Sequence, residues 1–285
     1  MKTVLLVLCL MTISMTSFSQ EVKDAPVSST KTPNMEKNSW GAKLKASPFS
    51  IGLSLQTKYV WRGMEMIPAS YETIYKYEDG NVVEDGYTKS GASAPVLFPT
   101  IGFSWKGLYV YAMGGYAVNG KYAEVDFGAS YNWKWLTVGF NDYYYPTITS
   151  VEDDYFNYKN RTTGHWLEVC ITIAPEKIPA SLTISNFFAG NDKRLDGKQA
   201  YSTYAELSTW YDFLRHHRIS ATCGMAFNKS CYNGYEHDFS VCNVELKYTY
   251  NVTFKNGFAL PLSASYILNP VYKKSFFNFT ASFTL

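Results

Sequence analysis

The fold is decided by the last eleven residues, Ser275-Phe276-Phe277-Asn278-Phe279-Thr280-Ala281-Ser282-Phe283-Thr284-Leu285. The odd-numbered residues from Phe277 to Leu285 are all apolar, and the even-numbered residues from Asn278 to Thr284 carry hydroxyl or amide groups. A period of two predicts a β-strand with one apolar and one polar face. An uncovered apolar strand tends to pair with other chains, and closing the sheet into a barrel removes the free edge. The stretch therefore predicts an antiparallel β-barrel. A terminal strand of a soluble β-sandwich is the alternative.

The composition suits a barrel that crosses a membrane. The chain has 285 residues, 17% aromatic and 18% charged, with a net charge of +2 and a mean hydropathy of -0.18. After the first 20 residues there is no apolar run of about 18 or more, the length that a membrane-spanning helix needs. A tilted strand needs only about 9 to 11 residues, and its alternating faces leave the average hydropathy ordinary. We therefore expect strands, and not helices, to span the membrane.

The amino terminus has the pattern of a secretory signal peptide, predicted over residues 1–19. Lys2 provides the charged start, residues 4–11 form a short apolar core, and Ser17-Phe18-Ser19 fits a small-x-small cleavage site. Residues 20–49 are rich in Ser, Thr, Lys, Asn and Pro, a composition that cannot bury much apolar area. We expect a secreted protein with a disordered periplasmic leader, followed by a barrel over 50–285.

Alternating hydrophobicity predicts twelve transmembrane strands in an up-and-down barrel. Besides the terminal strand, they lie at about 50–62, 97–105, 108–118, 121–131, 135–145, 164–174, 180–189, 200–212, 217–227, 237–248 and 258–267. An even number of strands places both chain ends on the same side. Long polar connections, above all the loop 64–97, alternate with short turns, and long loops belong to the outer surface of such barrels. Both termini are therefore expected in the periplasm.

Aromatic residues fall near predicted strand ends, as expected at the two interfaces of a membrane. The inner set is Trp105, Tyr131, Trp133, Trp135, Tyr211 and Tyr250, and the outer set is Tyr59, Trp61, Tyr144, Trp166, Tyr201 and Tyr266. This distribution favours the outer membrane of a Gram-negative cell envelope.

Three segments resemble those of TorF-type porins and allied outer-membrane β-barrels. They are Gln56-Thr57-Lys58-Tyr59-Val60-Trp61-Arg62-Gly63, Glu124-Val125-Asp126 and Asp142-Tyr143-Tyr144-Tyr145-Pro146. The terminal strand is also similar to the C-terminal assembly signal of bacterial outer-membrane barrels, although its last residue is Leu285 where an aromatic residue is usual. The resemblance implies an outer-membrane channel, inserted by the barrel-assembly machinery through this strand.

Charged residues with inward parity are the predicted channel-lining set. They are Lys58, Arg62, Glu124, Asp126, Glu168, Glu206, Glu245 and Lys247. Charges within a membrane span usually line a pathway or pair with one another. Because carboxylates predominate, we expect a porin-like channel for passive diffusion of small hydrophilic solutes that prefers cations. A closed ion-pair network that packs a narrow barrel is the alternative, as is a non-conducting structural or adhesive barrel acting through its outer loops.

A lipid hydrolase is the competing class of function. His165 and Asn186 have outward parity on neighbouring predicted strands, but position 167 is Leu and no activated hydroxyl accompanies the histidine. The remaining histidines, at 216, 217 and 237, lack metal-ligand spacing. We expect no enzyme, no cofactor, no metal and no nucleic-acid partner. The expected partners are outer-membrane lipid and the transported solutes.

Two further expectations concern the loops. Cys223 and Cys242 fall opposite each other, both outward, if the loop 228–236 is symmetric, and free thiols are expected because directly opposed positions strain a disulfide. The loop 64–97 is longer than a surface connection needs, which predicts that it folds over or into the mouth of the barrel and sets the bore.

Overall fold

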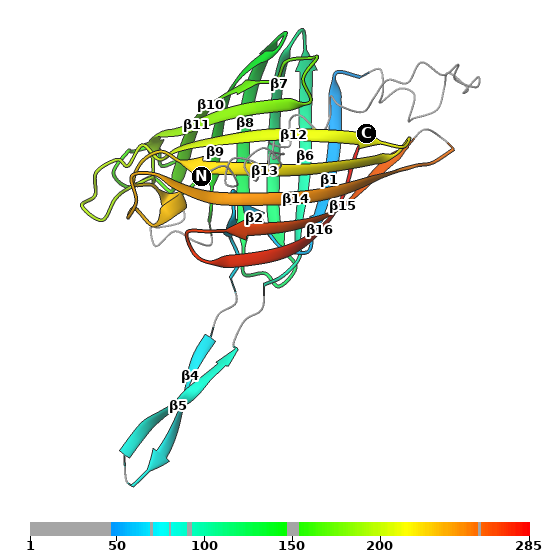
Figure 1. The fold of residues 1–285 in the computed structure, drawn as a ribbon. Coiled ribbons are helices and arrows are strands. Elements are labelled where there is room, and N and C mark those ends of the chain that lie inside the picture. The colour runs from blue at the N-terminus through cyan, green and yellow to red at the C-terminus, as the bar shows by residue number, and fades with distance from the viewer. Residues whose placement is uncertain (1–46, 69–70, 80, 90–92, 147–153, 256–257) are drawn as a thin grey trace, which may run out of the picture.

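The computed structural model describes residues 47–68, 71–79, 81–89, 93–146, 154–255 and 258–285. Most of them form a closed antiparallel barrel of twelve strands in which each strand pairs with its neighbours in the chain (Figure 1). The strands are β1 (Phe49–Gln56), β6 (Val96–Trp105), β7 (Leu108–Ala117), β8 (Ala123–Trp133), β9 (Leu136–Tyr144), β10 (His165–Ile173), β11 (Ala180–Gly190), β12 (Thr203–Phe213), β13 (His217–Ala226), β14 (Ser240–Thr253), β15 (Ala259–Asn269) and β16 (Lys274–Thr284). The predicted fold class and strand number are confirmed.

The terminal strand closes the barrel. β16 pairs with β15 on one side and with β1 on the other, where Leu53 lies opposite Phe283. The pairing ends with reciprocal hydrogen bonds between the backbones of Ile51 and Leu285. No strand of the barrel therefore keeps a free edge, which is why an apolar strand can stand at this position.

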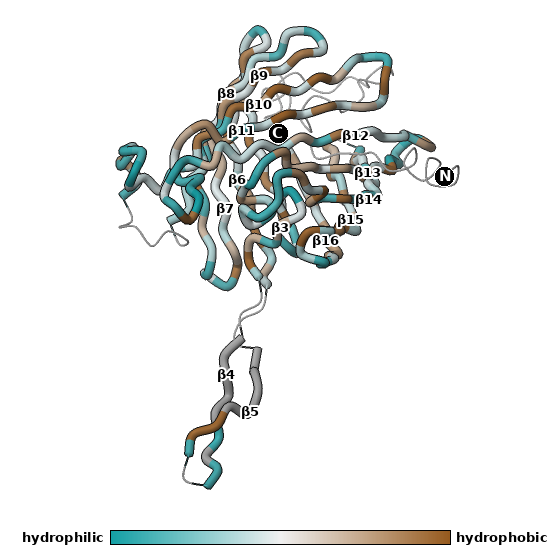
Figure 2. Tube along the Cα trace, turned by 60° about the vertical axis from the view of Figure 1, so that its left-hand side comes forward, coloured by the Kyte–Doolittle hydropathy of each residue, from teal (hydrophilic) through white to brown (hydrophobic). Residues whose placement is uncertain are grey.

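The wall has an apolar outside and a polar inside. Outward side chains such as Ile101, Phe127 and Ile171 are exposed. Side chains at the alternate positions of the strands, such as Ser208 and Thr222, are buried inside the barrel. Figure 2 shows apolar and polar positions interspersed along the strands, with strongly polar stretches at the loops. This alternation is the period-two pattern of the sequence, folded around a closed interior. Among the described residues, no helix has the length and apolar character needed to cross a membrane.

The first strand is shorter than predicted. β1 ends at Gln56, and the chain then leaves the wall, so the predicted strand 50–62 is wrong beyond this point. The Asn278 side chain of β16 marks the exit, because its Oδ1 accepts hydrogen bonds from the Thr57 hydroxyl (3.1 Å) and the Lys58 N–H (3.0 Å). A side-chain acceptor thus replaces the backbone pairing where the strand stops.

The connection between β1 and β6 contains two small hairpins. The first joins β2 (Val60–Trp61) to β3 (Met64–Glu65) and the second joins β4 (Tyr71–Glu78) to β5 (Asn81–Lys89). Neither pairs with the barrel wall, and Figure 1 shows the β4–β5 hairpin projecting away from the barrel. The end of the barrel where β1 finishes also carries the connections β9–β10, β11–β12 and β13–β14, and we call it the long-loop end. The signal peptide and the leader, up to residue 46, lie outside the described residues.

The aromatic sets behave differently at the two ends. At the end opposite the long loops, residues such as Trp105, Trp133 and Tyr211 are exposed on the outside, as expected for an interface. At the long-loop end, the expectation is wrong for Tyr59, which is buried, and for Trp61, which packs against the buried aromatic cluster inside the barrel. The physical reason is the early exit of the chain from the wall at residue 57.

The pairing of β13 with β14 places Cys223 and Cys242 differently from the expectation. A bulge between Gly224 and Met225 pairs Gly224 with Asn243 and Met225 with Val241, so the intervening Cys242 has no partner in this ladder. Cys223 lies opposite Val244, and Cys242 is buried in the interior cluster of aromatic residues. The predicted opposition of the two cysteines is therefore wrong, because the loop is not symmetric. The four described cysteines are free thiols.

The first prediction tests the two faces of β16. Phe279 is exposed on the outside, whereas Thr280 faces Gln56 across the β1 pairing and has inward parity. Phe279→Asp places a charge on the apolar wall and should cost up to about 3 kcal/mol, which lowers the yield of folded barrel in membranes. Thr280→Asp is the matched control and should retain the yield. Equal losses for the two variants would contradict the assignment of faces.

Candidate functional site

The β2–β3 hairpin turns back into the barrel. Arg62 (φ 50°) and Gly63 (φ 80°) form its turn, and both are in the left-handed region, as a tight hairpin of this kind requires. A side chain at Gly63 would collide with the backbone carbonyl of Cys242 in β14, so the turn lies directly against the inner wall. The Asn269 side chain of β15 donates to the Gly63 carbonyl (2.9 Å) and fixes the turn there.

Contacts on several sides show that the hairpin lies in the lumen. Val60 packs with Ile267 of β15 and Phe276 of β16. Trp61 makes ring contacts with Tyr143 of β9 and Phe187 of β11. Since β9 and β16 lie on different sides of the closed sheet, only a segment inside the barrel can contact both. At its base the hairpin is held by an ion pair between Lys58 and Glu65.

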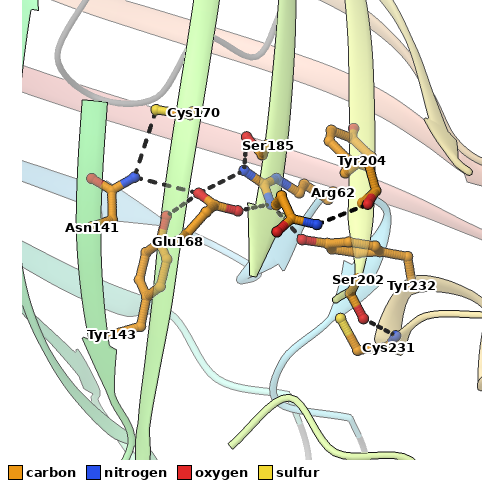
Figure 3. A network of polar contacts seen from close by, with 12 residues as sticks. Arg62, Asn141, Tyr143, Glu168, Cys170, Ser185, Ser202, Tyr204, Cys231 and Tyr232 are labelled. Atoms are coloured by element: carbon orange, nitrogen blue, oxygen red, sulfur yellow. Dashed lines mark hydrogen bonds and ion pairs between the residues drawn. The ribbon is translucent and has the colours of Figure 1, made fainter. Parts of the chain in front are cut away.

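Arg62 at the tip of the hairpin is bound by the inner wall (Figure 3). Its Nη1 and Nη2 donate to the two oxygens of Glu168 in β10, at 2.5 and 3.1 Å. Nη1 also donates to the Tyr232 hydroxyl (2.5 Å), and Nη2 to the Ser185 hydroxyl (3.0 Å). A bidentate ion pair with two further hydrogen bonds satisfies the fork geometry of a guanidinium.

Aromatic rings complete the binding site of the guanidinium. Its Cζ lies 4.5 Å from the centre of the Trp61 ring and 4.7 Å from that of Tyr204 in β12. Arg62 is 7% exposed and Glu168 1% exposed, so the pair is removed from water. Cation–π attraction is strongest under such conditions.

Glu168 is held from its other side as well. The Tyr143 hydroxyl donates to its Oε2 at 2.9 Å, and the Asn141 amide approaches the same oxygen at 3.3 Å. A buried carboxylate needs this complete set of partners, because the cost of removing two charges from water is offset only by good geometry and full hydrogen bonding. The site is therefore organised around Glu168.

Tyr232 reaches the site from the connection between β13 and β14. It belongs to the short 3-10 segment η1 (Cys231–Asn233), whose first N–H donates to the Ser202 hydroxyl at 3.0 Å. Ser202 in turn donates to Asp192 through its N–H and its hydroxyl, both at 2.7 Å. Burial raises the pKa of the Asp192 carboxyl, while the hydrogen bonds from Ser202 act in the opposite direction. Burial also raises the pKa of the Cys231 thiol, which keeps it protonated.

A second group of buried carboxyls lies on β8. The Tyr122 hydroxyl donates to Glu124 at 2.9 Å, and Tyr59, just before the hairpin, approaches the same carboxylate at 3.4 Å. Asp126 is 0% exposed, and neither of its carboxylate oxygens has a hydrogen-bond partner among the described residues. Among the described residues neither acidic group forms an ion pair, and burying two unpaired carboxylates on one face is unfavourable.

The other predicted lining residues occupy different positions. Glu206 of β12 accepts from the Tyr204 hydroxyl (2.7 Å), and Glu245 of β14 is buried. Lys247 of β14 is half-buried. Lys58 and Arg62 were predicted on the wall strand, and this placement is wrong, because both follow the exit of the chain at Gln56. The structure brings Arg62 to Glu168 but leaves Lys58 on Glu65 within the hairpin segment.

Sequence reasoning missed three partners of Arg62. Ser185 and Tyr204 have inward parity on their strands, so the same alternation that selected Glu168 could have found them. Tyr232 gives no such signal because it lies in a connection. The aromatic cluster that covers Arg62 forms because the hairpin enters the lumen. No local sequence pattern predicts this entry.

His165 lies on the outside of the wall and is covered by the β9–β10 connection. Its ring stacks on Tyr158 at 4.1 Å, and its Nδ1 and Nε2 lie 2.7 Å from an Asp142 carboxylate oxygen and from the Tyr155 carbonyl oxygen. Tyr158 also donates to Asp142 at 2.8 Å. The ring is fully buried, and both nitrogens are engaged in holding the connection against the wall. The Asn186 amide is likewise engaged, with the Tyr201 carbonyl and the Thr203 hydroxyl.

The barrel is similar in fold to solved structures of low sequence identity. No family model and no curated protein sequence matches the chain. Similar solved structures include a chain from work on the in-meso crystallization of membrane proteins, with 6% identity, 83% of each chain covered and a TM-score of 0.41. A triple mutant of the Rhodopseudomonas blastica porin has 9% identity over 83% of this chain and 98% of the porin, with a TM-score of 0.36. At these values the similarity carries no argument about function. The fold and the site define a twelve-stranded β-barrel with a lumenal hairpin.

The second prediction concerns the Arg62–Glu168 pair. Arg62→Gln should lower the free energy of unfolding by about 3–5 kcal/mol, because Glu168 is then left buried without its cation. Adding Glu168→Gln should recover a large part of this loss. The measurement is a double-mutant cycle on refolded protein in detergent, with unfolding followed by the heat-dependent shift in electrophoretic mobility. Additive losses in the two single variants would show that the pair contributes no coupling.

The third prediction concerns the connection over His165. His165→Leu removes both polar contacts of the ring and should release this connection, so that trypsin cleaves after the exposed Lys159 or Arg161 several-fold faster than in the unchanged protein. His237→Leu, at an exposed histidine of the β13–β14 connection, is the matched control. An unchanged cleavage rate in His165→Leu would mean that other contacts hold the connection.

Proposed function

We propose that this protein is an outer-membrane, porin-like channel for small hydrophilic solutes, with a preference for cations, and that the β2–β3 hairpin closes it in the present conformation. The observation that carries the proposal is the position of Arg62, which inserts a tethered cation into the acidic interior of the barrel. The resemblance of three segments of the chain to TorF-type porins is consistent with a porin-like channel.

The membrane location is supported by the outside of the barrel. Exposed apolar side chains alternate with buried polar ones along the wall, and aromatic residues are exposed at the end opposite the long loops. In water such a surface would associate, whereas in a bilayer it is solvated by lipid. We place the long-loop end outside the cell and both termini in the periplasm, with outer-membrane lipid and the assembly machinery as partners.

The preference for cations is supported by the charge of the interior. The interior holds five buried carboxyl residues, whereas the basic residues of the predicted lining set are three, namely Arg62, Lys58 and Lys247. The five are Glu124, Asp126, Glu168, Glu206 and Glu245. A ring or wall of carboxylates favours cations in a narrow pore.

Conduction then requires the hairpin to leave the lumen. Its turn lies against β14 and its Trp61 ring contacts β9 and β11, which supports a bore that is closed at this level while the hairpin stays. The hairpin makes no backbone ladder with the wall, and its attachment rests on side-chain contacts around Arg62, Val60 and Gly63. Such an element can move without opening the barrel itself.

The packed interior favours a second candidate, a structural or adhesive barrel that does not conduct. Glu124, Asp126 and Glu168 are at most 2% exposed, which is typical of a filled interior. The projecting β4–β5 hairpin could then act outside the barrel. Conductance separates the two candidates.

The fourth prediction concerns the bore. Replacing residues 59–66 with a Gly/Ser linker should remove the hairpin and raise single-channel conductance several-fold in planar bilayers. Replacing residues 71–89 with a linker is the control, and it should leave the conductance unchanged because the β4–β5 hairpin lies outside the barrel. A barrel without the β2–β3 hairpin that still does not conduct would favour the structural candidate.

The fifth prediction concerns ion preference. In the conducting variant without the hairpin, Glu124→Gln with Asp126→Asn should shift the reversal potential in a KCl gradient toward anions, because the change removes two lumenal carboxylates. Asp196→Asn with Glu236→Gln removes the same formal charge from exposed connections and serves as control. Equal shifts in both double variants would mean that selectivity depends on overall charge and not on the lumen.

A further inference from the structure

The lumen contains a complete recognition site for a guanidinium group. Glu168 accepts two N–H groups from one planar ion, and the hydroxyls of Tyr232 and Ser185 accept two more. The ring of Tyr204 lies on the ion at 4.7 Å. These groups come from β10, β11, β12 and η1, and Arg62 comes from none of them.

This arrangement is specific in chemistry. A bidentate carboxylate, two further acceptors and an aromatic face match the flat, forked shape of a guanidinium, whereas an ammonium presents three donors from one point and cannot satisfy both oxygens and both hydroxyls in the same way. The carboxylate is fixed by Tyr143 independently of Arg62 (2.9 Å), so the geometry of the acceptor does not depend on the hairpin alone.

We propose that this site binds solutes that carry a guanidinium group, and that Arg62 is a tethered substitute which occupies the site when the channel is closed. The inference deepens the proposed function, on which it rests, by naming the class of solute. A free guanidinium solute competes with Arg62 for Glu168, and its binding releases the tip of the hairpin. The effective concentration of the tethered group sets how much solute this competition needs.

The experiment removes the Arg62 side chain from the site and then adds a free guanidinium ion. Arg62→Gly removes the tethered guanidinium, and Gly suits the left-handed backbone at this position (φ 50°). Methylguanidinium at millimolar concentration should raise the Tm of this variant in a saturable manner by about 2–5 °C, because it binds the folded state alone. Ammonium and trimethylammonium at the same concentration should not. If Arg62→Gly folds poorly, methylguanidinium during refolding should increase the folded yield at least twofold where ammonium does not.

The control variant is Arg62→Gly with Glu168→Gln, which keeps the space and removes the carboxylate. No rise in Tm or in folded yield with methylguanidinium, or an equal rise in the control variant or with ammonium, would overturn the proposal. The readout does not use conductance. Binding of methylguanidinium by a protein that does not conduct would therefore overturn the proposed channel function but not the guanidinium site. Conduction without such binding would overturn the guanidinium site but not the channel function.

Discussion

The pairing of β1 with β16 closes the sheet, and both the wall and its interior follow from this closure. It satisfies the backbone of the wall without a free edge, and it separates the two faces of every strand into an outside and an interior. Once the sheet is closed, each inward side chain must find its partners inside the barrel. Polar side chains that a flat sheet would expose to water therefore contact one another inside the closed barrel.

That interior explains why the chain leaves the wall after Gln56. A barrel of twelve strands encloses more space than one of eight, and the segment around the β2–β3 hairpin packs into it. The segment brings apolar and aromatic side chains for packing, and Arg62 for charge. Asn278 stabilises the exit by accepting the N–H of Lys58, a group that would otherwise lose its ladder partner.

The charge of the interior connects packing with function. Glu168 would be costly to bury alone, and Arg62 offsets this cost only while the hairpin stays in the lumen. Glu124 and Asp126 lie nearby on β8 without an ion pair among the described residues. In the channel that we propose, the same acidic wall that stabilises the closed hairpin attracts a mobile cation once the hairpin is displaced. Tyr59, just before the hairpin, approaches Glu124, so the segment that carries Arg62 also contacts this acidic group.

The class of fold and the face of most wall residues follow from the amino-acid sequence alone. Alternation over ten or so residues is a local property, so twelve strands and the inward parity of Glu168 and Glu206 could be predicted from the chain alone. The positions of Tyr59, Trp61 and Arg62 depend on tertiary contacts, because the alternation continues past Gln56 while the chain no longer follows the wall. Pairing with β16 ends there, and the contacts that capture the hairpin come from strands and a connection up to about 200 residues away in sequence, as with Tyr232 and Asn269. Such contacts exist only after the barrel has closed, which is why no local pattern could predict them.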